Sequence, residues 1–189
     1  EKFAEDTHVE RREEYLKRGK NISLKECKEN IFRGTLAEFI ARNTLVFNGQ
    51  DISPVNVEIY LPEDKSMAPD LVCLNTGDRY HVKGALINRY EPSHLFEVWD
   101  SLIKTPKDNE YIISVSIDMG MMIGYVNACF KAKTLVDGGH IRLPRKKCEE
   151  FKAKKRAIYV DQIKNKLTPQ EIWGTLLERQ KKDISAKSV

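Results

Sequence analysis

Hydrophobic residues between positions 24 and 47 recur every three or four residues, which is the spacing of an amphipathic helix. The sequence Ser23-Leu24-Lys25-Glu26 is a capping box that would open this helix, and Gly49 would stop it. The pattern predicts a long helix over residues 23–47 with one face packed on a sheet. The residues predicted for that face are Leu36, Phe39, Ile40 and Thr44.

Several stretches have the pattern of β-strands. An apolar run at 71–74, the turn-forming sequence Asn75-Thr76-Gly77-Asp78 and an extended segment at 80–87 together predict a β-hairpin. Residues 55–60 predict a strand before this hairpin, and residues 110–118 and 121–126 predict two strands after it.

The remaining pattern predicts short elements. Residues 93–102 indicate a short helix with Phe96 and Trp99 on its apolar side, and residues 158–160 indicate a short strand. The sequence Thr168-Pro169-Gln170-Glu171 opens a last helix, with proline at its first position and glutamate at its third. Its apolar stripe would dock on the domain or on a second subunit, and consists of Ile172, Trp173, Leu176 and Leu177.

Composition narrows the class of protein. A chain of 189 residues with 41% hydrophobic content can bury a core in one domain. No apolar run approaches the roughly 20 residues of a membrane helix, and the N-terminus lacks a signal-peptide core, so we expect an intracellular protein without a membrane partner. The 4 cysteines form no C-x-x-C pair, which argues against structural zinc. No P-loop, G-x-G-x-x-G or G-x-S-x-G sequence is present.

Charge is mildly basic, with a formal net charge of +4, and its distribution is uneven. One charged stretch, at residues 10–20, mixes positive and negative side chains, which is typical of a solvated helix face. The most basic stretch interrupts its positive charges only with Glu149 and Glu150, and would attract phosphates. The residues predicted to contact nucleic acid are Arg145, Lys146, Lys147, Lys152, Lys154, Lys155 and Arg156.

The hairpin carries the candidate chemistry. Side chains alternate along a strand, so His81 and Lys83 share one face, and the hairpin would bring Asp70 near them. An aspartate oxygen can hold a hard divalent cation that polarises a phosphate and acidifies a water, and a lysine can stabilise the attacking hydroxide. The alternative is an ordinary surface hairpin with scattered polar residues.

These residues resemble the PD-(D/E)XK nuclease superfamily, particularly its subgroup in which a QVK signature replaces the acidic residue before the lysine. Residues 34–38, Gly-Thr-Leu-Ala-Glu, match the G-x-x-A-E pattern of the family's helix, and residues 55–60 match its first strand. Asp70 and the sequence His81-Val82-Lys83 match the rest in order and spacing. The resemblance also implies a helix near residues 128–136.

The resemblance implies roles for four residues. Glu38 and Asp70 would be ligands of Mg²⁺ or Mn²⁺, and Lys83 would be the catalytic lysine. His81 occupies the variable acidic position, where an imidazole would complete the metal shell, favouring manganese or a similar ion, or would orient a water or a phosphate. Alternatively, loss of the carboxylate leaves an inactive site. Glu58 is a further candidate ligand, with a solvated strand residue as its other interpretation.

The expected fold is α/β: a restriction-endonuclease-like mixed β-sheet flanked by helices. Residues 1–22 would form a charged N-terminal helical extension, 23–145 the nuclease core, and 146–189 the basic segment and C-terminal helix. The expected function is metal-dependent cleavage of duplex DNA, as in restriction, homing or phage-type endonucleases. Cutting both strands usually needs two active sites, so a homodimer or higher homo-oligomer is expected. The alternatives are an inactive nucleic-acid-binding or regulatory protein on the same fold and an RNA-directed nuclease.

Overall fold

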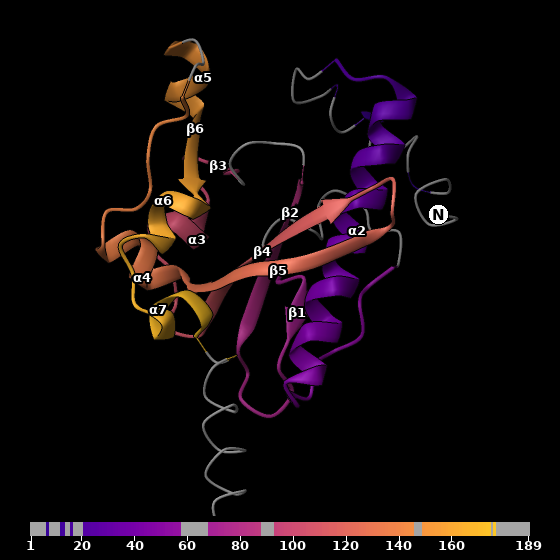
Figure 1. Ribbon diagram of the computed structural model, residues 1–189. Coiled ribbons are helices and arrows are strands. Elements are labelled where there is room, and N and C mark those ends of the chain that lie inside the picture. Colours follow the sequence, from indigo (N-terminus) through magenta and orange to yellow (C-terminus); the bar gives the residue numbers. More distant parts are fainter. Residues whose placement is uncertain are drawn as a thin grey trace, which may run out of the picture.

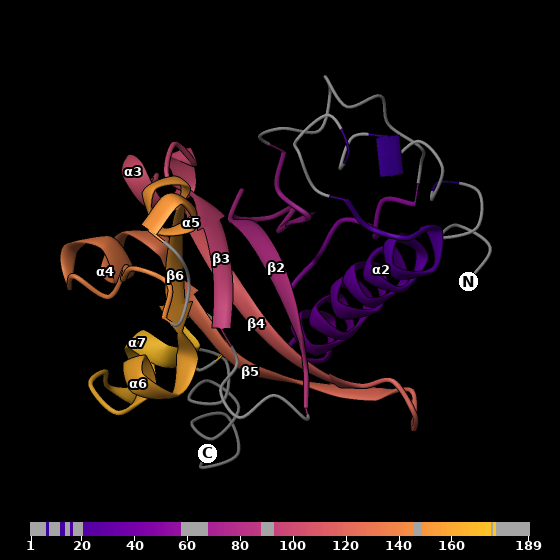
Figure 2. The same cartoon turned by 90° about the horizontal axis from the view of Figure 1, so that it is seen from above.

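One long helix, α2 (Leu24–Phe47), lies across one face of a mixed sheet, and the smaller elements gather on the other side of that sheet (Figures 1 and 2). The computed structural model describes residues 7, 12–13, 16, 21–57, 68–87, 93–145, 149–174 and 176. The predicted extension over residues 1–22 therefore lies almost entirely outside the described residues.

Helix α2 confirms the first prediction. The Ser23 side chain accepts a hydrogen bond from the Glu26 backbone N–H at 3.0 Å, and Gly49 follows the C-cap with a positive φ of 72°. Leu36 and Ile40 of the predicted face are partly buried against the core, whereas Phe39 is 44% exposed. The buried positions of the helix are Cys27, Ala37, Ala41 and Leu45. Small side chains are buried here because the helix approaches the sheet closely.

The main sheet contains β1 (Leu71–Val72), β2 (Arg79–Leu86), β4 (Glu110–Asp118) and β5 (Ile123–Lys131) in the order β1-β2-β4-β5. Strands β2 and β4 are parallel, and the two outer pairs are antiparallel. The predicted hairpin is confirmed, and so is the strand over residues 110–118. Strand β5 continues to Lys131, so the helix expected near 128–136 begins only at α4 (Ala132–Asp137).

A second, two-stranded sheet corrects the prediction for residues 93–102. Residues Ser93–Glu97 form β3, which pairs antiparallel with β6 (Lys155–Tyr159), and only α3 (Ser101–Lys104) is helical. Burial alternates along β3: His94 and Phe96 are buried, while their neighbours in the strand are more exposed. Trp99, predicted to share the apolar side with Phe96, is 64% exposed. Pairing with a strand distant in sequence overrides the local helical pattern.

The strand predicted before the hairpin is not formed where the structure describes it. Residues 53–57 have no regular structure, and an isolated bridge joins Ile52 to Cys73. Val55 is buried in the core without strand pairing. Residues 58–60, including the candidate ligand Glu58, lie outside the described residues.

The C-terminal half supplies short helices: α5 (Glu149–Lys154), α6 (Val160–Lys164) and α7 (Pro169–Trp173). Helix α7 has the predicted capping box between Thr168 and Glu171. The strand predicted at 158–160 is β6, shifted toward the N-terminus because residue 160 already begins α6.

The sheet separates two hydrophobic clusters. One lies between α2 and the sheet and includes Ala41, Tyr80 and Val115. The other includes Ile112 and Phe130 from the sheet, together with Phe96 and residues of β6, α6 and α7. Strand β6 and helices α6 and α7 thus pack on the domain itself. Among the residues that the structure describes, no helix is both long and apolar enough to cross a membrane.

Candidate functional site

Asp70 lies where β1 begins, against the edge of β2. Its backbone N–H donates to the Tyr80 carbonyl at 3.0 Å, and its carboxylate oxygen Oδ2 accepts the Val82 N–H at 2.6 Å. Val82 separates His81 from Lys83, so the carboxylate is held beside the sequence that carries both. The predicted proximity of Asp70 to the hairpin's second strand is therefore present in the structure.

Glu38 lies on α2 one helical turn before Arg42, so the two residues share one side of the helix. Arg42, one turn later on the same side of the helix, donates to the Ser53 and Ile52 carbonyls at 3.0 and 3.5 Å. That segment borders β1, since the Ser53 hydroxyl accepts the Val72 N–H at 2.9 Å. Glu38 and Asp70 are thus on the same flank of the α2–β2 packing.

Gly84 is the residue of β2 at which α2 packs most closely on the strand. A Cβ atom built on Gly84 would lie 3.0 Å from the Ala37 Cβ and 3.2 Å from the Ile117 Cδ1. Because Ala37 precedes Glu38 and Gly84 follows Lys83, this contact places Glu38 near the level of the Val82–Gly84 segment. A glycine is required here for the helix to approach so closely.

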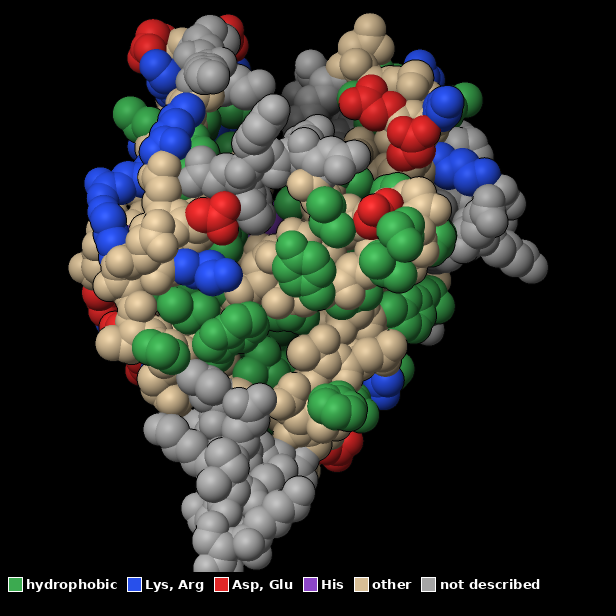
Figure 3. Space-filling model, in the orientation of Figure 1, with side chains coloured by type: hydrophobic (Ala, Val, Ile, Leu, Met, Phe, Trp, Pro, Cys, Tyr) green, Lys and Arg blue, Asp and Glu red, His purple; other side chains and the backbone are tan. Residues whose placement is uncertain are grey.

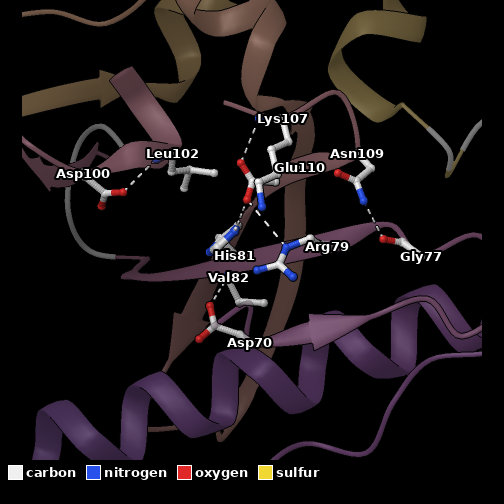
Figure 4. A network of polar contacts seen from close by, with 10 residues as sticks. All are labelled: Asp70, Gly77, Arg79, His81, Val82, Asp100, Leu102, Lys107, Asn109 and Glu110. Atoms are coloured by element: carbon white, nitrogen blue, oxygen red, sulfur yellow. Dashed lines mark hydrogen bonds and ion pairs between the residues drawn. The ribbon is translucent and has the colours of Figure 1, made fainter. Parts of the chain in front are cut away.

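His81 and Lys83 occupy the face of β2 that α2 does not cover. Tyr80 and Val82 pack in the cluster beneath α2, and side chains alternate along the strand. The Lys83 ammonium lies 5.7 Å from the centre of the Phe96 ring on β3, within cation–π range. Lys83 is therefore directed toward the second sheet. Asp70 lies at the strand edge toward α2 (Figure 4).

His81 meets a buried carboxylate that the sequence did not single out. Its Nε2 atom lies 3.9 Å from Oε1 of Glu110, and the same oxygen lies 3.6 Å from the Arg79 Nε (Figure 4). The other carboxylate oxygen accepts the Lys107 N–H at 3.0 Å. Burial lowers the pKa of His81 below its usual value; Asp70 and Glu110 oppose that shift, and Lys83 adds to it.

The sequence pattern predicts Glu110 as the first residue of a strand and gives it no functional role. It lies opposite Arg79 only through the parallel register of β2 and β4, whose strands are separated by more than twenty residues of chain. The available signal is a charged residue that directly precedes the β-prone run from Tyr111 to Ile117.

The described residues contain no group of three His, Cys, Asp or Glu side chains that could hold a metal ion. Glu38, Asp70 and His81 therefore do not assemble as a three-ligand centre, since His81 lies on the far face of β2 from α2. The two carboxylates on the α2 flank are the hard oxygen ligands that Mg²⁺ takes, and Mg²⁺ commonly uses only one or two carboxylates plus water. Their ligand role stays a prediction.

A buried polar network lies next to Lys83. The His94 Nε2 is 2.8 Å from the Ser114 hydroxyl, and the Asn127 side-chain amide donates to the hydroxyls of Ser114 and Ser116 at 3.4 and 2.8 Å. Ser114 is the partner of Lys83 in the β2–β4 register. Burial, reinforced by the nearby Lys83, lowers the pKa of His94 to about 3.

The basic segment is largely paired within the protein. Lys152 and Lys154 form ion pairs with Glu149 and Glu150 at 2.6 and 2.9 Å, and Lys155 pairs with Glu97. Acidic and basic side chains lie close together around α5 (Figure 3). These pairs reduce the field that would attract phosphates.

The other basic residues predicted to contact nucleic acid are Arg156, Arg145, Lys146 and Lys147. The Arg156 guanidinium donates to the backbone carbonyls of Lys152 and Lys155, and the Arg145 guanidinium lies 4.5 Å from the Tyr159 ring centre. Lys146 and Lys147 lie outside the described residues. Contact with nucleic acid through this segment stays a prediction.

Comparison with known proteins adds no family to this geometry. No protein-family model matches the chain, and neither a curated protein nor a solved structure matches it.

Proposed function

We propose that this protein is a metal-dependent endonuclease that hydrolyses DNA phosphodiester bonds, with an active site at the edge of β2. The supporting observation is the hydrogen bond from the Val82 N–H to the Asp70 carboxylate, which fixes Asp70 beside the His81-Val82-Lys83 sequence. The α/β arrangement, with α2 on one face of a mixed sheet, is compatible with a restriction-endonuclease-like fold.

Glu38 and Asp70 would hold the ion from the α2 flank. One Asp70 oxygen already accepts a backbone N–H, which orients the carboxylate and leaves its other oxygen for a ligand. A bound Mg²⁺ or Mn²⁺ would supply charge stabilisation at the phosphate and lower the pKa of a bound water.

Lys83 is a donor and a fixed positive charge next to this edge. Its long side chain lies near the Phe96 ring and would turn toward the strand edge when a phosphate binds there. In that position its ammonium donates hydrogen bonds to a non-bridging phosphate oxygen, where negative charge develops. His81 orients a water or the phosphate from the same face of the strand.

A catalytically inactive nucleic-acid-binding protein is the second candidate. The observation that favours it is the separation of His81 from the α2 flank, which leaves no three-ligand group among the described side chains. Binding without cleavage would be its signature.

The test is a cleavage assay with supercoiled plasmid, linear duplex DNA and single-stranded RNA, each with Mg²⁺ and with Mn²⁺. Asp70→Asn removes the charge but retains an oxygen that accepts the Val82 N–H, and Lys83→Met retains the apolar stem. Both variants should lose cleavage while melting at the temperature of the wild type. Asp51→Asn, at an exposed carboxylate near β1, is the matched control and should cleave normally.

Three outcomes separate the candidates. Metal-dependent products that vanish in both variants would support the DNA nuclease, and products from RNA alone would replace DNA with RNA as the substrate. A wild type that shifts DNA in a gel but leaves every substrate intact would establish the binding protein instead.

A further inference from the structure

Glu110 is a buried carboxylate that the proposed catalytic residues do not explain. It is 6% exposed, and it opens β4 directly opposite Arg79 on the neighbouring parallel strand. Burying a carboxylate is costly unless charged or polar groups surround it. One of its oxygens accepts the Lys107 N–H at 3.0 Å, and the other lies 3.6 Å from the Arg79 Nε, which is ion-pair distance, so its position is held from two sides.

The oxygen that faces Arg79 also faces His81. The His81 Nε2 lies 3.9 Å from the Glu110 Oε1, and this nitrogen is buried and makes no hydrogen bond with the residues that the structure describes. The distance is longer than a hydrogen bond but short enough for an electrostatic contact between the ring nitrogen and the carboxylate. The described surroundings of this nitrogen thus offer it an acceptor.

The chemistry of the two groups selects one form of the neutral ring. A carboxylate oxygen only accepts, whereas each imidazole nitrogen is a donor when protonated and an acceptor when not. A lone pair on Nε2 would face the lone pairs of Glu110 and be repelled. A proton on Nε2 instead gives an attractive contact, and the neutral ring then carries its lone pair on Nδ1.

We propose that Glu110 is a positioning residue that holds His81 with its proton on Nε2, so that Nδ1 is the ring atom presented to a ligand. In Figure 4, Glu110 extends from β4 to one ring nitrogen of His81, and the other nitrogen points away from it. A carboxylate behind an imidazole in this way fixes both ring orientation and tautomer. Glu110 thus supplies, from a different strand, a negative charge next to the His81 ring.

The consequence for the reaction rests on the proposed function. Because the Nε2 proton faces Glu110, Nδ1 is the ring atom whose lone pair accepts a hydrogen bond from a water or binds an ion at this site. Arg79 compensates the charge of Glu110, so the carboxylate remains an acceptor and does not itself compete for the ion.

The experiment is an NMR measurement of the ring nitrogens in the ¹⁵N-labelled free protein, at a pH where His81 is neutral. Signals of His81 are identified by their loss in His81→Gln. The expected result is one tautomer with the proton on Nε2, and an Hε2 resonance protected from exchange with water. In Glu110→Leu that protection should disappear and the tautomers should mix. Asp118→Asn, at the opposite end of the same strand, is the control and should leave the His81 signals unchanged.

A proton on Nδ1 in the wild type would overturn the proposal, and so would His81 signals that are the same in folded Glu110→Leu as in the wild type. The wild-type spectrum alone decides the tautomer, so the proposal remains falsifiable even if Glu110→Leu fails to fold. Because no substrate or metal is added, a failure of the nuclease assay and a failure of this inference are recorded in separate experiments.

Discussion

Lowering the pH from about 7 to about 5 should destabilise the fold through His94. The imidazole is almost fully buried, and its Nε2 contacts the Ser114 hydroxyl within the network that includes Asn127 and Ser116. Burial and the nearby Lys83 lower its pKa to about 3 in the folded protein, against an ordinary value of 6.5. Protonation therefore occurs far more readily in the unfolded chain.

The sign and size follow from proton linkage. Because the folded pKa is depressed, the neutral imidazole contributes stability that is fully present above pH 6.5 and is lost as the pH falls toward about 3. Below the unfolded pKa the loss is about 1.4 kcal/mol per pH unit, or about 2 kcal/mol at about pH 5. Continued to about pH 3, the loss would approach about 5 kcal/mol.

Urea unfolding of the wild type and of His94→Gln at several pH values between about 7 and about 5 measures the stability lost through His94. This pH interval lies above the range where most carboxylates titrate. The wild type should lose about 2 kcal/mol more than the variant across that interval. His140→Gln, at a less buried loop histidine, is the control and should retain most of the wild-type slope. Parallel pH dependences for the wild type and His94→Gln would refute the reasoning.

Three other predictions concern packing, capping and association. Gly84→Ala should lower the free energy of unfolding, measured in urea, by about 1–3 kcal/mol, because the added Cβ would meet Ala37. The control is Gly34→Ala in α2, whose added Cβ meets nothing within 4 Å and which should raise that free energy by up to about 1 kcal/mol; equal effects of the two substitutions would contradict the close helix–sheet contact. Thr168→Ala should cost about 1 kcal/mol by removing the capping box of α7, and an unchanged urea midpoint would count against it. Strand β5 is an edge of the described sheet, and hydrophobic side chains gather over it (Figure 3). Tyr125 on this strand is 56% exposed, so Tyr125→Lys should shift any homo-oligomer toward the monomer. Light scattering measures this shift, and an unchanged mass would place the interface elsewhere.

Local pattern was sufficient for the elements whose signal is long or strongly periodic. The helix over 24–47 has a cap, a stop and many turns of apolar spacing, and β4 (Glu110–Asp118) is a continuous β-prone run. The order of Asp70, His81 and Lys83 along a hairpin was also readable, because a hairpin is defined by its turn. The predictions of a helix at residues 93–97 and of a strand at residues 55–57 are wrong, since the conformation of both segments depends on partners or packing elsewhere in the chain.

The sequence by itself therefore determined the long helix, the hairpin, the main parallel-paired strand and the residues that suggest phosphodiester chemistry. Tertiary structure alone decided which flank each of those residues occupies. The Val82 N–H orients Asp70, the alternation of β2 sends Lys83 and His81 to the face away from α2, and the β2–β4 register brings Glu110 to His81. Spacing along a chain specifies a side chain's direction only within its own element, whereas contacts between elements require the register and packing of the folded sheet.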